Sequence, residues 1–310
     1  MTTRRAILVF AALFFSADRG RAAEVSPQQT TLDTAQIERL TGAKGQLDET
    51  AGVFKVSVPR TDLEVHTAGV RMTPPLGLTS WAAFTRLGED IAMMGDLVLL
   101  EDQVNPVMSA ALDAGLDVTA LHNHFLLDSP KVMFMHVGGM GSEVGLATAV
   151  GSVFSAIQKT SGGKGAFPKA DVDPARSTLD PKKIEPILGV SGSLKDSVYK
   201  LVVGRTTKMK GYVIGGAMGV NTWAAFAGSD ASAIVDGDVA MLQSELQPVL
   251  RALRSQGIQV VAIHNHMTEE EPRIVFLHYW GAGPSTELAS AVRAALDLTR
   301  GPTPTPSRLH

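Results

Sequence analysis

The sequence predicts an α+β fold made of two tandem repeats of one α/β sandwich unit. In each unit we expect an antiparallel sheet with helices on one face, and we expect the two units to pack with pseudo-twofold symmetry. Three observations indicate this fold class: an internal repeat, short β segments alternating with amphipathic helices, and enough length for two cores. The chain has 310 residues, of which 45% are hydrophobic, and chains of this length commonly divide into two domains.

The internal repeat is visible in a tryptophan motif and in the histidines. Trp81-Ala-Ala-Phe84 recurs as Trp223-Ala-Ala-Phe226, an offset of 142 residues (223 − 81). A gap-free comparison of Trp81–Val150 with Trp223–Val292 gives 25 identities in 70 positions. The sequence therefore contains two copies of one structural unit.

The repeat sets the predicted domain limits. The first repeat domain spans residues 31–158 and the second spans 178–300. Residues 159–177, rich in Gly, Ser, Lys and Pro, have the composition of an exposed linker. Residues 301–310 alternate Pro with Thr and are expected to form a disordered tail.

Residues 1–23 have the pattern of a signal peptide. Arg4-Arg5 gives a positive start, and the apolar run Ala6–Ala17 is too short to span a membrane. We therefore expect an exported protein, periplasmic or extracellular, that uses the general secretory or the twin-arginine route.

Composition excludes several classes of site and partner. There are no cysteines, so disulfides, thiolate metal sites and a lipidated N-terminal cysteine are excluded. The net charge of −3 favours neither nucleic acid nor a stable membrane anchor as a partner. A small-molecule ligand remains open, as does the oligomeric state.

Each repeat begins with a short helix and a strand. Asp33 and Asp180 are suited to cap the helices, because a carboxylate accepts hydrogen bonds from the first backbone N–H groups. Val53–Val58 and Val198–Val203 have strand composition. The following stretch, Val65–Phe84, contains Pro and Gly and is predicted to be extended and irregular.

A second strand and helix follow in each repeat. Short strands are predicted at Leu97–Leu100 and Val239–Leu242, each after a Gly-Asp pair that is typical of a turn. Asp102 and Ser244 are predicted to cap the next helices. Apolar residues at helical spacing form one face of each helix, and a glycine ends it. The apolar positions are Val104, Val107, Met108, Ala111 and Leu112, then Leu246, Val249, Leu250 and Leu253, and the glycines are Gly115 and Gly257.

The repeat closes with two β segments and a helix. Asp117–Phe125 and Val132–Val137 are predicted strands joined by a turn, and a turn containing Gly138, Gly139 and Gly141 leads to the last helix. Trp81 and Phe84 with their second-repeat counterparts are either core residues or the wall of a pocket.

Three histidines of the first repeat are predicted to share one sheet face. His122 and His124 are two residues apart on a strand, so they point the same way. Pairing centred on Ser129 would place His122 opposite His136, and pairing centred on Pro130 would place His124 there. The second repeat has the same pattern.

The two triads suggest metal binding, with a structural alternative. His122, His124 and His136 would form one site, and His264, His266 and His278 the other, or both triads would form one shared site at the pseudo-twofold interface. Such a donor set suits zinc, copper or iron and leaves a position open for water. Alternatively, the histidines are hydrogen-bonded within the core or line a small-molecule pocket.

Asp96 and Asp238 are the candidate catalytic carboxylates. Each occupies a matching position in its repeat and could bind a metal, orient a histidine or act as a general base. The alternative, which we favour from sequence, is a simple turn before a strand. No nucleotide-binding motif is present, because Gly138–Gly141 lacks the dinucleotide spacing.

Together these patterns resemble the DUF1259 family, also called LppY/LpqO, of exported bacterial proteins of unknown function. The resemblance is carried by Val-Pro-Arg60-Thr-Asp-Leu, Trp-Ala-Ala-Phe, Gly-Asp and the His-Asn-His…His block, and it covers about Thr31–Arg300. It implies an exported tandem-domain protein without an established activity. The sequence therefore leaves two functions open: a metal-binding protein, including a metal-dependent hydrolase, or a non-enzymatic periplasmic small-molecule-binding or envelope-associated module with structural histidines.

Overall fold

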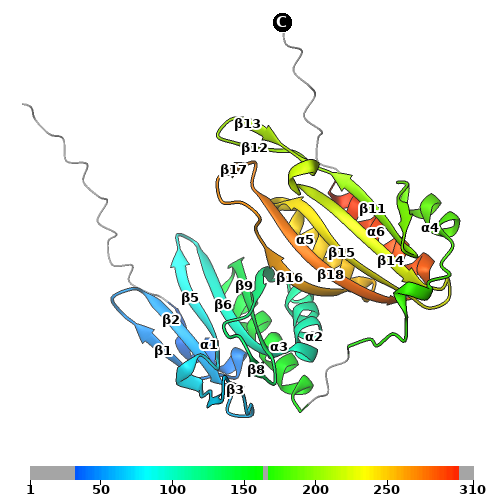
Figure 1. The fold of residues 1–310 in the computed structure, drawn as a ribbon. Coiled ribbons are helices and arrows are strands. Elements are labelled where there is room, and N and C mark those ends of the chain that lie inside the picture. The colour runs from blue at the N-terminus through cyan, green and yellow to red at the C-terminus, as the bar shows by residue number, and fades with distance from the viewer. Residues whose placement is uncertain (1–31, 163–166, 300–310) are drawn as a thin grey trace, which may run out of the picture.

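The computed structural model describes residues 32–162 and 167–299, and these form one continuous sheet with helices against it (Figure 1). The expected signal peptide (1–23) and tail (301–310) lie outside the described residues. Among the helices that are described, none combines the length and the apolar character needed to cross a membrane.

The first half contains three helices and nine strands in its described part. They are α1 (Thr34–Thr41), β1 (Gly45–Asp48), β2 (Val53–Pro59), β3 (His66–Thr67), β4 (Val70–Arg71), β5 (Thr79–Leu87), β6 (Asp90–Leu100), α2 (Glu101–Asp113), β7 (Asp117–His122), β8 (Asp128–Ser129), β9 (Val132–Gly141) and α3 (Glu143–Thr160). Short 3₁₀ turns lie at Pro74–Leu76 and, in the linker, at Pro174–Arg176.

The second half repeats this order. It comprises α4 (Pro181–Leu188), β10 (Ser193–Lys195), β11 (Val198–Gly204), β12 (Thr207–Met209), β13 (Tyr212–Ile214), η3 (Gly216–Met218), β14 (Asn221–Gly228), β15 (Ala233–Leu242), η4 (Gln243–Glu245), α5 (Leu246–Ser255), β16 (Gln259–His264), β17 (Glu270–Glu271), β18 (Ile274–Gly283) and α6 (Ser285–Leu298).

The order of the strands is symmetric about the middle of the sheet. The 12-stranded sheet runs β1-β2-β5-β6-β9-β7-β16-β18-β15-β14-β11-β10, so corresponding strands are met from either end. β7 and β16 join the halves through the antiparallel pair Leu121 and Ile263. These two residues are themselves 142 apart (263 − 121), so the pseudo-twofold axis passes through their pair.

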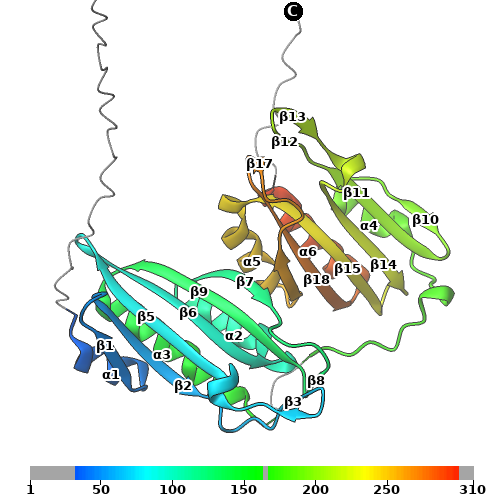
Figure 2. The same cartoon turned by 60° about the vertical axis from the view of Figure 1, so that its left-hand side comes forward.

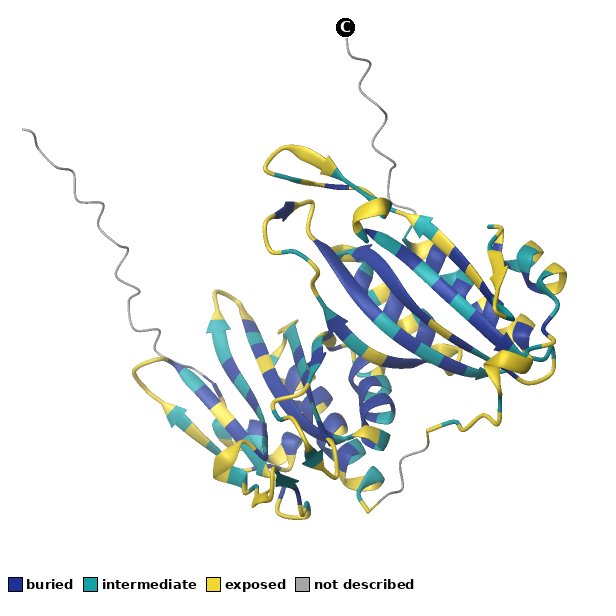
Figure 3. Cartoon of the chain, in the orientation of Figure 1, coloured by how far each residue is buried: buried dark blue, intermediate teal, exposed yellow. Residues whose placement is uncertain are grey.

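The helices cover one face of the sheet in each half (Figures 1 and 2). Apolar residues of the helices and of the facing strand positions form one buried cluster that includes both Leu121 and Ile263. Figure 3 shows this buried layer between sheet and helices. The predicted α+β fold with an antiparallel sheet and helices on one face is confirmed.

The opposite face carries two small sheets, β4-β3-β8 and β13-β12-β17. Each covers a small second core at one end of the main sheet. In the first half this core contains Val98, Val132 and Phe134, and in the second half it contains Ala240 and Phe276. The rest of this face, called the open face below, bears the polar residues of interest.

A bulge interrupts the start of β7 and of β16. Val118 pairs with Val137, but Ala120 pairs with His136, so Thr119 is an extra residue in β7. The same shift occurs between Val260 and Ala262. An extra residue reverses which side chains face the helices. For this reason Val118 and Leu121 both face the helix-side core although they are three residues apart.

Two amide side chains join the halves beside the bulges. The Val118 N–H donates to Gln247 Oε1 (3.0 Å), and Gln247 Nε2 donates to the Val118 carbonyl (2.8 Å). In the symmetric contact, Val260 N–H donates to Asn105 Oδ1 (2.8 Å), and Asn105 Nδ2 donates to the Val260 carbonyl (3.2 Å). Each amide side chain thus makes the two hydrogen bonds to the backbone of the other half that a neighbouring strand would otherwise make.

The predicted start of each central helix was wrong: α2 begins earlier than a cap at Asp102 implies, and α5 begins at Leu246, later than a cap at Ser244 implies. The Leu100 N–H donates to Gln103 Oε1 (3.0 Å), so α2 begins at Glu101, and Asp102 lies within its first turn. In the second half the Leu242 N–H donates to Glu245 Oε2 (2.7 Å), which forms the turn η4. Ser244 lies within this turn and does not cap α5.

Several predicted strand limits were also wrong. The Gly-Asp pairs are not turns, because β6 and β15 run straight through them. The stretch predicted to be irregular includes the long strand β5, and the predicted glycine turn is the end of β9. β7 ends at His122, three residues before the predicted limit of Phe125.

Loss of either amide clamp, meaning the side-chain amide of Asn105 or of Gln247, should destabilise the fold. In Asn105→Ala the buried N–H and C=O of Val260 lose both partners, so we expect the free energy of unfolding to fall by about 2 kcal/mol. Gln247→Ala should have a similar effect through Val118. Urea denaturation measures the change, with the exposed Gln46→Ala as a matched control. An unchanged midpoint in both clamp variants would show that the seam does not depend on these contacts.

Candidate metal centre

The antiparallel register places an aromatic, a carboxylate and a histidine in one row on the open face. Trp81 pairs with Asp96, and Asp96 pairs with His136. In the second half Trp223 pairs with Asp238, and Asp238 pairs with His278. Directly paired residues have Cβ atoms roughly 4.5–5.5 Å apart, so each row brings these side chains together.

The histidines share the open face as predicted, but the predicted pairing was wrong. His122 pairs with Phe134, and His136 pairs with Ala120, so the turn centres on neither Ser129 nor Pro130. The reason is the short two-residue strand β8, which takes Asp128 and Ser129 into a separate sheet with β3.

In the first half the three rings form a stack around His122. The ring centre of His122 lies 5.2 Å from that of His124 and 5.0 Å from that of His136. His124, beyond the end of β7, stacks on Phe134 with ring centres 3.4 Å apart. His122 Nδ1 lies 3.3 Å from the Asn123 carbonyl, which fixes its ring toward the backbone.

In the second half three donor atoms converge. His264 Nε2 and His266 Nε2 are 3.1 Å apart, and His266 Nε2 lies 3.9 Å from Asp238 Oδ2. One ligand atom from each of Asp238, His264 and His266 lies within 4.8 Å of the other two. The closest group therefore joins two of the predicted histidines to a carboxylate.

His278, the third predicted histidine, lies beside this group. Its ring is parallel to that of His264, with centres 4.8 Å apart and an interplanar angle of 8°. Its Nδ1 lies 3.4 Å from the Gly237 carbonyl, so Nδ1 is the nitrogen that donates a hydrogen. The lone pair then lies on Nε2, the nitrogen that could bind an ion or accept a proton.

Both carboxylates are buried on the open face. Asp96 is 8% exposed and Asp238 3%, and Oδ1 of each has no hydrogen-bond partner among residues 32–162 and 167–299. A buried carboxylate oxygen without a partner is costly unless a cation or another donor meets it. The sequence contained a signal for this position: apolar residues at Ile91, Met93, Leu97 and Leu99 alternate as in one strand through Asp96.

The glycine before each carboxylate allows the strands to approach closely. A Cβ on Gly95 would lie 2.9 Å from the Trp81 carbonyl oxygen, and a Cβ on Gly237 would lie 2.5 Å from the Trp223 carbonyl oxygen. Both distances are shorter than any normal contact. The Gly-Asp pair is therefore a packing requirement of the central strands that also fixes the carboxylate.

Burial keeps two of the imidazoles neutral. It lowers the pKa of His124 and of His264, while Asp96 and Asp238 respectively act in the opposite direction. The neighbouring histidines lower both pKa values further. A neutral imidazole has the lone pair that a metal ion needs.

The aromatic residues predicted as core or pocket wall, two tryptophans and two phenylalanines, lie on opposite faces of the sheet. Phe84 and Phe226 are fully buried on the helix side. Trp81 and Trp223 lie on the open face, where Lys55 Nζ lies 4.1 Å above the Trp81 ring and Lys200 Nζ lies 4.2 Å above the Trp223 ring. Trp223 also meets His278 edge-on, with ring centres 6.5 Å apart.

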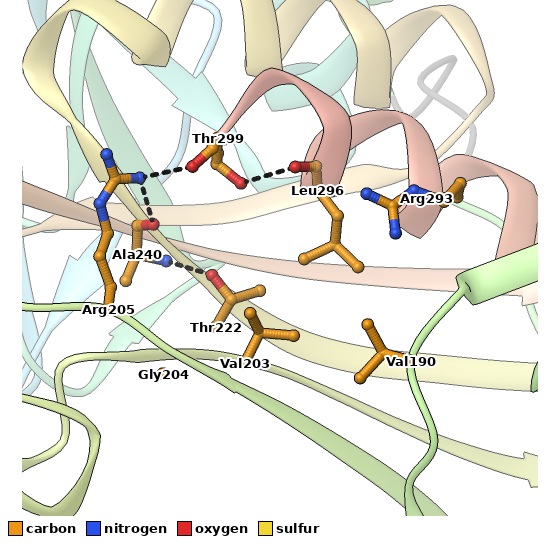
Figure 4. Close-up of a pocket in the computed structure, with 9 residues that line it drawn as sticks. All are labelled: Val190, Val203, Gly204, Arg205, Thr222, Ala240, Arg293, Leu296 and Thr299. Atoms are coloured by element: carbon orange, nitrogen blue, oxygen red, sulfur yellow. Dashed lines mark hydrogen bonds between the residues drawn. The ribbon is translucent and has the colours of Figure 1, made fainter. Parts of the chain in front are cut away.

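A small cavity elsewhere in the second half does not include the histidines (Figure 4). It has a volume of about 110 Å³ and lies between β11, β15 and the end of α6. Arg205 at its edge already pairs with Glu245 (2.7 Å) and donates to the Thr299 carbonyl. Arg293, which also lines the cavity, donates to the Leu188 carbonyl and to Asp297 Oδ1 (2.8 Å), so both arginine charges at the cavity have partners within the protein.

Comparisons with known proteins identify a family but no activity. A family profile described as "Domain of Unknown Function (DUF1259)" matches residues 35–156 and 182–298. No curated protein matches the chain. A solved structure described as a trimeric bacterial microcompartment shell protein PduB is similar over 80% of this chain and 86% of its own, with 10% identity and a TM-score of 0.19. A TM-score this low does not indicate a shared fold.

Adding a methyl group beside the buried carboxylate should disturb the second half. In Gly237→Ala the new Cβ meets the Trp223 carbonyl and the Tyr279 ring, so we expect the free energy of unfolding to fall by about 1–3 kcal/mol. Thermal or urea denaturation measures this. Ser232→Ala, at an exposed position directly before β15, serves as the control. Equal stability of Gly237→Ala and the wild type would contradict the close approach.

Proposed function

The chain belongs to the DUF1259 family of proteins of unknown function, and we propose that it is an exported protein that binds a divalent transition metal ion through Asp238, His264 and His266. Export is supported by the basic and apolar pattern of residues 1–23.

One observation carries the metal proposal. Three side chains offer ligand atoms within 4.8 Å of one another, and one of them is a buried carboxylate whose Oδ1 has no partner in the part of the chain that the structure describes. A hydrogen-bonded core histidine pair would explain the 3.1 Å contact between His264 and His266. Such a pair would not explain why the Asp238 carboxylate is buried beside these histidines with no donor to its Oδ1 among the described residues.

The donor set fits a zinc or ferrous ion. Two nitrogens bound to one tetrahedral zinc, each at about 2.0–2.1 Å, lie about 3.3 Å apart, close to the 3.1 Å between His264 Nε2 and His266 Nε2. The carboxylate oxygen, at 3.9 Å from His266 Nε2, would move inward slightly. Two histidines and one carboxylate are also the ligands of non-haem iron sites with open positions.

In its enzymatic form, the proposal is a metal-dependent hydrolase. A metal ion with three protein ligands lowers the pKa of a water molecule in its open position. His278 would act as the general base, because its Nδ1 is committed to the Gly237 carbonyl and its Nε2 is free to accept a proton. His266 is partly exposed, so a ligand can reach the site from solvent.

A non-enzymatic module with structural histidines is the second candidate. The observation that favours it is ring stacking: His266 lies on Phe276 with ring centres 3.5 Å apart, as His124 lies on Phe134. In this case the imidazoles cover the small cores of the open face and hydrogen-bond with each other, and the site has no ion.

Ligand substitutions should abolish binding at the second-half site. We expect Asp238→Asn and His266→Ala to lose its zinc, because each removes one of three ligands. Isothermal titration of metal-free, untagged protein measures the stoichiometry, and elemental analysis checks it. His66→Ala is the matched control, since His66 lies in β3 and belongs to neither triad. If both ligand variants still bind one equivalent of zinc at the second-half site, the assignment is refuted.

Zinc should stabilise the folded chain if the site is real. An ion that binds only the folded state at 100 times its dissociation constant adds about 2.7 kcal/mol to the free energy of unfolding. We therefore expect a higher thermal midpoint with zinc, reversed by a chelator and smaller in Asp238→Asn. The structural alternative predicts no shift, so a midpoint that ignores zinc would favour it.

A further inference from the structure

We infer that the first half of the chain holds a second divalent-metal centre, built by Asp96, His122 and His124, and that it binds its ion more weakly than the second-half centre. This inference rests on the proposed function, because it extends the same ligand chemistry to the other repeat.

The backbone frame of the two centres is the same. Asp96 lies between Trp81 and His136 in the sheet, as Asp238 lies between Trp223 and His278. Each strand that carries the His-x-His motif has its bulge at the corresponding residue. Asp96 and His122 therefore occupy the same positions in the sheet as Asp238 and His264.

Asp96 supplies the observation that points to a cation. It is 8% exposed, and its Oδ1 has no hydrogen-bond partner in the described segments of the chain. No lysine or arginine forms an ion pair with it among the described residues, whereas Asp62 in the same half pairs with Arg60 at 2.9 Å. The rings of His122 and His136 are stacked with centres 5.0 Å apart, and His136 pairs with Asp96 in the sheet, so the imidazoles lie beside this carboxylate. An ion held between these groups would satisfy the carboxylate.

The imidazoles of the first half are less well arranged for an ion. Only in the second half do three donor atoms of described residues lie within 4.8 Å of one another. In the first half His122 Nδ1 lies by the Asn123 carbonyl, and His124 is stacked on Phe134. Both rings must turn about their side-chain bonds before they can bind one ion. This rearrangement opposes binding, so we expect lower affinity.

The loop next to each centre adds to this difference. The first half has Leu127-Asp128-Ser129 where the second has Glu269-Glu270-Glu271. Three carboxylates follow the His-x-His motif of the second half, against one in the first; Glu269 pairs with Lys210 at 3.8 Å, and the other two still make the loop beside the second-half centre the more negative one. A divalent cation is attracted more strongly to the second half at low ionic strength.

Zinc titration of the metal-free, untagged full chain tests the inference. We expect the wild type to bind two equivalents of zinc at two classes of site. The affinity of the weaker class should be roughly tenfold or more below that of the tighter class. Asp96→Asn should lose the weak class and keep the tight one, and Asp238→Asn should do the reverse. Asp90→Asn, on the same strand as Asp96 but exposed, is the matched control and should bind two equivalents.

The outcomes separate this inference from the proposed function. One equivalent in the wild type, unchanged in Asp96→Asn and lost in Asp238→Asn, overturns the first-half centre and leaves the proposed second-half centre intact. No binding by the wild type overturns both. If Asp96→Asn fails to fold, His124→Ala replaces it, because His124 is exposed. Two equivalents in a folded His124→Ala protein would also overturn the inference.

Discussion

The one-residue bulge near the start of β7 and of β16 is the constraint on which the rest of the structure depends. Before the bulge, Val118 faces the helix-side core; after it, Leu121 does. His122 is thereby directed to the open face. Without the extra residue, the strand would have to choose between burying its apolar residues and exposing its histidine, because strand side chains alternate strictly. The bulge allows both within six residues.

The same bulge also explains how the halves are joined. β7 and β16 share only one registered pair, Leu121 with Ile263. Beyond it, Val118 and Val260 would have unpaired backbone groups within the protein, and these are bound by Gln247 and Asn105 from the other half. Buried backbone groups are costly when unpaired. The geometry that orients the histidines therefore also creates the polar contacts that hold the seam.

The sequence was sufficient for the fold class and for the shared face of the histidines, but not for the donor set. Periodicity identified the buried faces of α2 and α5, and the repeat identified the symmetry. The bulge could not be predicted, because Thr119 is an ordinary strand residue and only the pairing with β9 shows that it is extra. Asp238 was a candidate ligand or general base from sequence, but a turn was favoured because Gly-Asp is common in turns. The glycine is there because the strands of the central sheet leave no room for a Cβ.

The position of the symmetry axis has a consequence for how such a protein can change over evolutionary time. Leu121 meets its own counterpart at the seam, as a residue does on the axis of a dimer with two identical subunits. The chain is thus organised as a homodimer whose subunits have been fused into one polypeptide. In a homodimer every mutation appears twice, so both sites must keep the same affinity. Fusion removes that restriction, and the leucine-containing loop of one half and the glutamate-rich loop of the other show that the two halves have already diverged beside the His-x-His motifs.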